Sequence, residues 1–434
     1  MKLRIKSALR PLAALSLVSS LGVGLAGCGS SASDSSSNEQ VLEIYSWWTN
    51  PGETDGLKAV TNEFQASHPG TQVVNAAVSD ISNAHQQLED RMRNALPPDT
   101  FQTNGGWDML RWVATNGQDD SQSKLEPLDS LDFAPSLRAA LTPSILDSIS
   151  YNNKLYGVPA SVRRLNSLFY NKRVLAANGL EPPTTLEELY AVGDALKAKG
   201  IVPLAFGDKS GSMFTLLAWE ALFVAKAGAD FHTSYFRGQE QADDPRVVDT
   251  LNEFVKILDY MNDDRDMIDW PEAATRLVKG QAAMMFIGDW AKGLFLSVGM
   301  VPNVDFGEMP MVGTAGNFVY TVDTFALPQG ARGRASAVDF LRLLASPETQ
   351  GMIDPILGSA SPRTDTSPDK FDPLGQQTIS DFRTSTLIPD HLNLVKESSF
   401  TSALDGAMMT FQRDKNVDAM VNLLKNRYDQ LQQP

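Results

Sequence analysis

Polar and charged side chains stand next to aromatic ones at several points where a strand is expected to end. Four such groups occur: Trp47, Trp48 and Glu53; Gln102 and Asn104; Arg164 and Asn166; Asp289, Trp290 and Lys292. A flat ring can cover an apolar ligand face, while charged and amide groups around it hydrogen-bond to hydroxyls. A pyranose presents both kinds of surface, because its C–H groups form apolar faces and its hydroxyls form a polar belt. The combination therefore favours a carbohydrate site.

The two adjacent tryptophans raise a question of orientation. Successive side chains of a strand point to opposite faces, so at most one of Trp47 and Trp48 can share a face with Ile44. One interpretation makes both rings structural, wedged between layers of the fold. The other interpretation packs one ring in the core and turns the second toward a ligand, and there we expect Trp48 to face the ligand.

Other kinds of chemistry find little support in the motifs. The chain has no phosphate-binding loop, no G-x-S-x-G nucleophile motif and no H-E-x-x-H zinc motif. Four histidines are scattered without the spacing of metal ligands: His68, His85, His232 and His391. The acidic run at 263–269 lacks the glycine and the distal glutamate of a calcium loop. We therefore expect no metal, no cofactor and no catalytic residues.

An enzymatic alternative nevertheless stays open. Carboxylates are plentiful, and two of them could hydrolyse a glycosidic bond if the fold brought them to its two sides. Such a pair is defined by its geometry in space and leaves no motif in the sequence. A secreted glycoside hydrolase that uses a pair of cleft carboxylates is thus the alternative to a binding protein.

The first 27 residues have the features of an export signal. A basic start precedes an apolar stretch that is short and broken by serine and glycine. It ends in LAGC at Leu25–Cys28, which resembles the bacterial lipobox and implies that Cys28 becomes a lipid anchor to the bacterial membrane, on its periplasmic or cell-surface side. Residues 28–40 read as a Ser-rich tether. The Gly22-x-Gly24-x-x-Gly27 pattern lies inside the signal, so it predicts no dinucleotide site.

Charge and cysteine content exclude further classes. Cys28 is the single cysteine of the 434 residues, so the exported fold has no disulfide and no thiol nucleophile. Removal of the first 27 residues takes away four positive charges and no negative ones, which changes the net charge from −15 to −19. Because binding to phosphate backbones needs a basic surface, nucleic acid is excluded as a partner.

Strands and helices are expected to alternate through two stretches of the chain. In the first stretch, 41–47, 71–78 and 99–104 read as strands separated by helical patterns. In the second, 165–171 and 201–207 flank a helix that opens with a capping box at Thr185 and Glu188. A later strand runs through 282–290. Such alternation predicts an α/β fold with parallel sheets, whose ligands lie at the carboxyl ends of the strands.

Six segments in order resemble one protein family. They are IYSWWTNPGE, PPDTFQTNGG, RRLNSLFYNKRVL, GQAAMMFIGDWAKG, VDTFALP and GSASPRTD, and they span the chain from the first strand to the late loops. Together they are similar to the sugar-binding proteins of ABC importers, extracellular solute-binding family 1, in its glucose/mannose-type branch. The resemblance implies a two-lobed periplasmic-binding-protein-like fold of type II with a ligand cleft between the lobes. Lobe 1 would comprise 41–156 plus 312–358, and lobe 2 would comprise 157–311 plus 359–434.

The resemblance also implies a function and its partners. The protein would be the substrate-binding lipoprotein of an ABC importer, a monomer that captures a monosaccharide or short oligosaccharide and delivers it to the transmembrane subunits of a permease. Its motifs place Trp47, Trp48, Glu53 and Gln102 in lobe 1, and the other family positions follow: Arg164, Asn166, Asp289, Trp290, Lys292, Asp323 and Arg363.

The chain departs from the family pattern at two amides. Asn104 stands where relatives often have His or Lys, and Asn393 stands where they often have a cleft His, with His391 two residues earlier. We expect these three residues to line the site. Because an amide offers hydroxyls a different set of donors and acceptors, the preferred sugar should differ from glucose.

Overall fold

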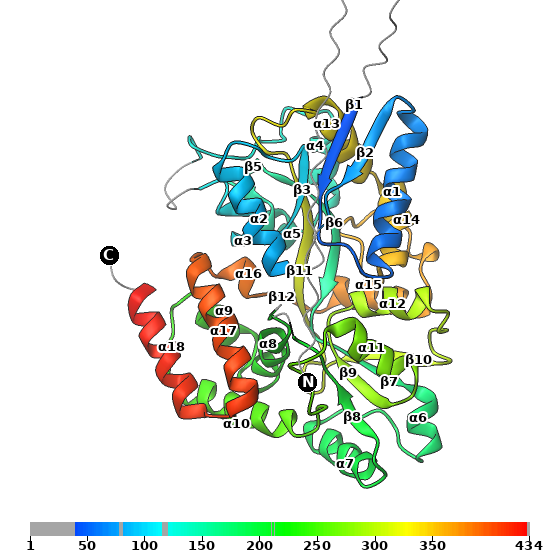
Figure 1. Ribbon diagram of the computed structural model, residues 1–434, viewed down its shortest axis with the longest axis vertical. Coiled ribbons are helices and arrows are strands. Elements are labelled where there is room, and N and C mark those ends of the chain that lie inside the picture. The colour runs from blue at the N-terminus through cyan, green and yellow to red at the C-terminus, as the bar shows by residue number, and fades with distance from the viewer. Residues whose placement is uncertain (1–39, 78–80, 115–119, 210, 212, 432–434) are drawn as a thin grey trace, which may run out of the picture. The chain divides into compact units, whose positions relative to one another are not determined.

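Two separate β-sheets organise the chain, and helices pack around each of them (Figure 1). The computed structural model describes residues 40–431 apart from 78–80, 115–119, 210 and 212. The predicted signal, Cys28 and the tether as far as residue 39 lie outside the described residues.

The first sheet has six strands. Five of them are hydrogen-bonded in the order β12-β11-β3-β1-β2, and the sixth, β6, lies off this order and pairs with β11. The strands are β1 (Gln40–Tyr45), β2 (Thr71–Asn75), β3 (Thr100–Asn104), β6 (Gly157–Arg164), β11 (Asn317–Ala326) and β12 (Thr386–Pro389). β1 runs parallel to β2 and β3, whereas β11 runs antiparallel to β3 and β6. β3 lies between β1 and β11, β6 pairs only with β11, and both strands are buried along their whole length.

The second sheet has four strands in the order β10-β7-β9-β8. They are β7 (Ser167–Asn171), β8 (Val202–Ala205), β9 (Ala282–Phe286) and β10 (Phe306–Pro310). β8 and β9 are parallel, and β7 is antiparallel to both β9 and β10. A small hairpin of β4 (Ser150–Tyr151) and β5 (Lys154–Leu155) lies apart from both sheets.

Each sheet has its own hydrophobic core. Helices that contribute to the first core are α1 (Glu53–Ser67), α2 (Ile81–Arg93), α3 (Trp107–Leu110), α4 (Ala134–Ala140), α5 (Pro143–Ser148), α13 (Arg334–Leu344), α14 (Pro347–Leu357) and α15 (Pro373–Thr384), the last preceded by the 3₁₀ turn η2 (Pro368–Lys370). In α1, Leu57, Val60 and Phe64 fall on one face at helical spacing and are fully or almost fully buried.

The second core is built mainly by the remaining helices. They are α6 (Lys172–Ala177), α7 (Leu186–Lys197), α8 (Phe214–Ala227), α9 (Ala229–Phe236), α10 (Pro245–Leu258), α11 (Trp270–Val278), α12 (Trp290–Ser297), α16 (His391–Leu394), α17 (Ser398–Asp414) and α18 (Val417–Leu431). The predicted start of α7 is confirmed, since the Thr185 hydroxyl accepts a hydrogen bond from the backbone N–H of Glu188.

Sheet pairing differs from the predicted lobe boundaries at two strands. β6 and β12 were placed in the second lobe, yet both pair with β11 of the first sheet, with Gly157 opposite Ala326 and Thr386 opposite Asn317. The chain therefore passes from the first sheet to the second after Arg164 and returns before Asn317. No helix in the described part of the chain is long and apolar enough to cross a bilayer.

Candidate functional site

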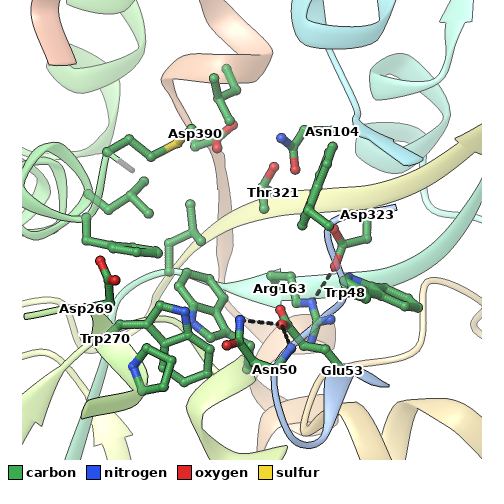
Figure 2. Close-up of a pocket in the computed structure, with 18 residues that line it drawn as sticks. Trp48, Asn50, Glu53, Asn104, Arg163, Asp269, Trp270, Thr321, Asp323 and Asp390 are labelled. Carbon is green, nitrogen blue, oxygen red and sulfur yellow. Dashed lines mark hydrogen bonds and ion pairs between the residues drawn. The ribbon is translucent and has the colours of Figure 1, made fainter. Parts of the chain in front are cut away.

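A cavity of about 390 Å³ is lined by residues of both sheets and of the loops and helices next to them (Figure 2). The first sheet and its loops contribute Trp47, Trp48, Asn50, Glu53, Asn104, Arg163, Thr321, Asp323, Asp390 and Leu392, and the second contributes Leu165, Met213, Phe214, Leu217, Asp269, Trp270, Pro271 and Trp290. The first group is mostly polar and the second mostly apolar. A ligand here would meet most of the hydrogen-bonding groups on the first side, together with the rings of Trp47 and Trp48, and mainly apolar side chains on the second.

Four tryptophans border this cavity. β1 ends at Tyr45, so Trp47 and Trp48 lie on the following loop, where strand alternation no longer assigns them to opposite faces. Trp48 is almost fully buried and packs edge-on against Phe325, while Trp47 packs edge-on against His85. Both rings therefore pack in the first core and also border the cavity.

The other two rings come from helix starts in the second lobe. Trp270 is the first residue of α11 and Trp290 the first residue of α12. The ring of Trp290 lies against the backbone of Gly288, where a Cβ would come within 2.0 Å of the ring. Because glycine has no side chain, the ring can approach the backbone there, and it is partly buried where it borders the cavity.

A buried ion pair forms the polar wall. The Nε of Arg163 donates to Asp323, whose carboxylate also accepts from Ser161 Oγ at 3.0 Å and from Gln102 Nε2 at 2.8 Å. Arg163 donates through Nη1 to the carbonyl of Leu357 at 3.0 Å. A buried charge pair needs such additional hydrogen bonds to offset its desolvation, and this pair has three of them.

Glu53 stands beside this pair at the start of α1 (Figure 2). One of its oxygens accepts from the Asn50 side-chain amide at 3.1 Å. Burial raises the pKa of Glu53 to about 7, while the nearby Arg163 acts in the opposite direction. Near neutral pH this carboxyl can therefore both donate and accept hydrogen bonds.

Three buried polar atoms on the cavity residues have no hydrogen-bond partner among the described residues. They are Nη2 of Arg163, Oγ1 of Thr321 and Oδ2 of Asp390. Thr321 and Asp323 are two residues apart on β11, so both point to the same face of the sheet. Buried polar groups in native proteins are almost always satisfied, and hydroxyl groups of a bound ligand would satisfy these.

Asp390 is held by groups behind the cavity. Its Oδ1 accepts from the side-chain amide of Asn393 at 2.7 Å, and burial raises its pKa to about 7. The neighbouring His391 binds Glu220 through Nδ1 at 2.9 Å, and Glu220 also contacts His232 at 2.7 Å. Burial alone would raise the pKa of Glu220, but the two imidazoles outweigh it and lower that pKa to about 2.

Six of the residues expected at the site line the cavity: Trp47, Trp48, Glu53, Asn104, Trp290 and Asp323. Asn104 donates from its amide to Asp108 at 3.2 Å. Gln102 lies behind the wall, where it supports Asp323 and accepts from Ser46 at 2.7 Å.

Three expected residues of the second-lobe wall have partners inside the protein. Arg164 binds Asp381 at 2.7 Å, and its backbone N–H donates to Asp289 at 2.8 Å. Asp289 is fully buried and does not line the cavity, because β9 ends at Phe286 and the following turn directs this carboxylate inward. Lys292, also buried, forms an ion pair with Asp372 at 3.0 Å.

The remaining expected residues also lie behind or away from the lining. Asn166 donates to Thr314 Oγ1 at 2.9 Å and accepts from the Val319 N–H at 3.0 Å, so it links the two segments that pass between the sheets. Arg363 binds Asp365 and the carbonyl of Ala345. The expected Asn393 supports Asp390 and the expected His391 binds Glu220, and neither lines the cavity.

Several lining residues were missed by sequence reasoning. Asp269 and Trp270 repeat the Asp-Trp helix start of residues 289–290, a signal that could have found them. Arg163 is adjacent to the expected Arg164 on β6, and Thr321 precedes the expected Asp323 by two positions. Asp390 had no motif to indicate it. No group of three His, Cys, Asp or Glu in the described part of the chain could hold a metal ion.

The family model of the bacterial extracellular solute-binding proteins matches residues 50–351. An uncharacterized ABC transporter extracellular-binding protein of Pyrococcus horikoshii is 32% identical over 412 residues, covering 93% of this chain and 91% of that protein. The "Probable sugar-binding periplasmic protein" of Brucella suis is 26% identical over 348 residues, with 80% of each chain covered.

The fold is also that of a solved solute receptor. The crystal structure of the bacterial receptor AcbH, with an exclusive substrate preference for β-D-galactopyranose, aligns with a TM-score of 0.77 at 17% identity, covering 91% of this chain and 99% of that one. This likeness shows the predicted two-lobed fold. The extent of the family match and of the Pyrococcus relative shows that the chain belongs to the bacterial extracellular solute-binding proteins.

Proposed function

We propose that this protein is the substrate-binding component of an ABC importer and that it captures a sugar in the cavity between its lobes. The observation that carries the proposal is a cavity lined by four tryptophans that also contains buried hydrogen-bonding atoms without partners among the described residues, with a mainly apolar second side. Such a lining matches the apolar faces and the hydroxyl belt of a pyranose. Relatives named as sugar-binding proteins support the same ligand class.

The energetics are sufficient for capture at micromolar concentration. Burying roughly 100 Å² of ligand C–H surface on a ring contributes about 2.5 kcal/mol. Each hydrogen bond to a charged group such as Arg163 adds about 1.5 to 3 kcal/mol. A few such contacts, less the free energy of ordering the ligand, reach the roughly 8 kcal/mol of a micromolar complex.

The proposal includes a location and a partner. Lipid attachment at Cys28 would hold the protein at the outer side of the bacterial membrane, and the Ser-rich residues between Cys28 and β1 would act as the tether. The captured sugar would pass to the transmembrane subunits of a permease, with the binding protein acting as a monomer and without chemical change to the sugar.

A panel of sugars tests the binding function. The protein without its first 28 residues is heated with glucose, galactose, mannose, xylose, and their di- and trisaccharides, and the unfolding temperature is recorded. A ligand present at 100 times its Kd should stabilise the fold by about 2.7 kcal/mol. Calorimetry then gives the stoichiometry, which should be one. Absence of any shift across the panel would contradict sugar binding.

The titration of Glu53 is the observation that favours the hydrolase alternative. The raised pKa of Glu53 is a property of general acids in glycosidases. Its neighbour Asp323, however, is neutralised by Arg163 and occupied by three donors, which suits a structural carboxylate better than a nucleophile. Labelled oligosaccharides incubated with the protein should therefore be recovered intact, whereas new reducing ends that vanish in Glu53→Gln would identify an enzyme.

A further inference from the structure

Acidic groups outnumber basic ones among the described residues that line the cavity. Four of these residues carry a carboxyl group: Glu53, Asp269, Asp323 and Asp390. One of them, Arg163, carries a guanidinium. Figure 2 shows Glu53, Asp269 and Asp390 at separate positions around the space. A ligand in this cavity therefore meets more acidic groups than the lining itself can neutralise.

The positive charge of Arg163 is already taken up by acids of the protein. Its Nε donates to Asp323, and its Nη1 lies 4.0 Å from a carboxyl oxygen of the buried Asp289. A single guanidinium carries one charge, so Arg163 balances at most one of the four carboxyl groups of the lining. The remaining three depend on other partners for their charge balance.

Asp390 is the lining acid whose surroundings most clearly suit a cation. It is fully buried, and its Oδ1 accepts from the side chain and the backbone N–H of Asn393 at 2.7 Å and 3.0 Å. Its Oδ2 has no hydrogen-bond partner in the described part of the chain. The charged groups beside it, His391 and Glu220, pair with each other at 2.9 Å. Burial raises the pKa of Asp390 to about 7, and His391 offsets only part of that rise.

The rings of the cavity suit a positively charged sugar as well as a neutral one. An indole face attracts a cation, and it also covers an apolar C–H surface. An anionic sugar, such as a sugar phosphate or a uronic acid, would instead be repelled by the excess of carboxyl groups. The lining is therefore complementary to a sugar that carries a positive charge.

We infer that the cavity selects an amino sugar, whose protonated amine donates to Asp390 while its ring lies against the tryptophans. The inference rests on the proposed sugar-binding function and narrows the ligand class from sugars in general to sugars with a free amine. An ammonium group supplies both the hydrogen bond that Oδ2 lacks and a positive charge beside the carboxylate. A hydroxyl group supplies only the hydrogen bond.

Calorimetry at about pH 6.5, where aliphatic amines are protonated, tests the inference. Glucose, glucosamine and N-acetylglucosamine differ in one substituent, which is a neutral hydroxyl, a charged amine or a neutral amide. The corresponding derivatives of galactose and mannose extend the series to other ring configurations. Asp390→Asn keeps the size of the side chain and removes its charge. Asp55→Asn is the control, because Asp55 is exposed on α1 and does not line the cavity.

We expect at least one amino sugar to bind the wild type about tenfold or more tightly than its neutral parent and its N-acetyl derivative, because hydrogen bonds between charged groups are the stronger ones. Asp390→Asn should abolish this preference, and Asp55→Asn should retain it. Binding of the amino sugar to the wild type should also release protons, because the ammonium group converts the Asp390 carboxyl to its charged form. Binding enthalpies measured in buffers of different ionisation enthalpy report this release without any variant.

Three outcomes would contradict the inference. Neutral sugars that bind as tightly as their amino derivatives, or a preference that survives Asp390→Asn, would overturn it and leave the proposed function intact. Cyclohexylamine, an amine without hydroxyls, should bind far more weakly than the amino sugar. If it binds equally tightly, or if no sugar of any kind binds, the inference and the proposed function both fail.

Discussion

The guanidinium of Arg163 lies over the indole ring of Trp48, with 5.5 Å between its central carbon and the ring centroid. The same arginine binds Asp323, so one side chain connects a ring and a carboxylate that both border the cavity. These two contacts restrict the position of the Arg163 side chain. The ligand-facing wall is therefore ordered before any ligand arrives.

Replacing Arg163 should destabilise the fold itself. Arg163→Ala leaves Asp323 as a buried carboxylate without its cation, and removing one partner of a buried pair costs about 3–5 kcal/mol. Urea denaturation measures this loss. Arg93→Ala is the control, because its pairs with Glu89 and Asp90 on α2 are exposed and worth under about 1 kcal/mol. A loss as small as that of the control would mean that the buried pair contributes little.

Gly288→Ala should weaken ligand binding through Trp290. The added Cβ would lie 2.0 Å from the ring, so the ring must leave its present position at the border of the cavity. We expect about a tenfold loss of affinity for the sugar found in the panel, with about 1 kcal/mol or more of overpacking strain.

A second glycine provides the matched control for this change. Gly406 lies in α17 with no atom within 4 Å of its would-be Cβ, so Gly406→Ala should leave affinity unchanged and stabilise the helix by about 1 kcal/mol. Wild-type affinity in Gly288→Ala, measured by calorimetry, would show that the orientation of Trp290 is unimportant.

Glu53 should make the fold less stable as the pH rises. Burial raises its pKa from 4.5 to about 7 in the folded state, so between these values the folded protein holds a proton that the unfolded chain has released. Its stabilising contribution is complete below pH 4.5 and is lost as the pH rises through 7.

Glu53→Gln removes this dependence. Between pH 4 and pH 8 the free energy of unfolding of the variant should rise by on the order of 3 kcal/mol relative to that of the wild type, as measured by denaturation at each pH. Glu63→Gln, on the exposed side of the same helix α1, is the control, and its free energy of unfolding should change with pH as that of the wild type does. A difference between Glu53→Gln and wild type that is constant with pH would refute the shifted titration.

Cys28→Ser tests the anchor. Without the thiol there is no site for the lipid, so the variant should appear in the soluble fraction of fractionated cells and bind sugar with unchanged affinity. A variant that stays with the membranes, or that has lost binding, would show that Cys28 is not simply an anchor.

The sequence patterns predicted where strands end more reliably than they predicted which side chains at those ends face the cavity. The groups around Trp48 and Trp290 were found because aromatic and polar residues follow short strands, and both rings border the cavity. Arg163 and Arg164 illustrate the limit. Consecutive residues of a strand face opposite ways, and only the pairing of β6 with β11 decides that Arg163 faces the cavity while Arg164 reaches Asp381.

Asp390 and Asp289 show why the sequence could not predict which carboxylates line the cavity. Whether a carboxylate lines a cavity or fills a buried network depends on which distant segments meet it. Asp289 receives the Arg164 N–H across 125 positions of the chain, and Asp390 is bordered by Glu220 and His391. Such partners are set by the packing of the two sheets rather than by local pattern.

The placement of the tryptophans makes intrinsic fluorescence a probe of the cavity. Four of the seven tryptophans in the sequence, Trp47, Trp48, Trp270 and Trp290, border one cavity. Of these four, Trp47, Trp48 and Trp270 are buried and Trp290 is partly exposed, so a molecule that enters this space displaces water from Trp290 above all. The emission of an indole shifts to shorter wavelength as its surroundings become less polar. The arrival of a ligand can therefore be followed in real time by intrinsic fluorescence, without a label.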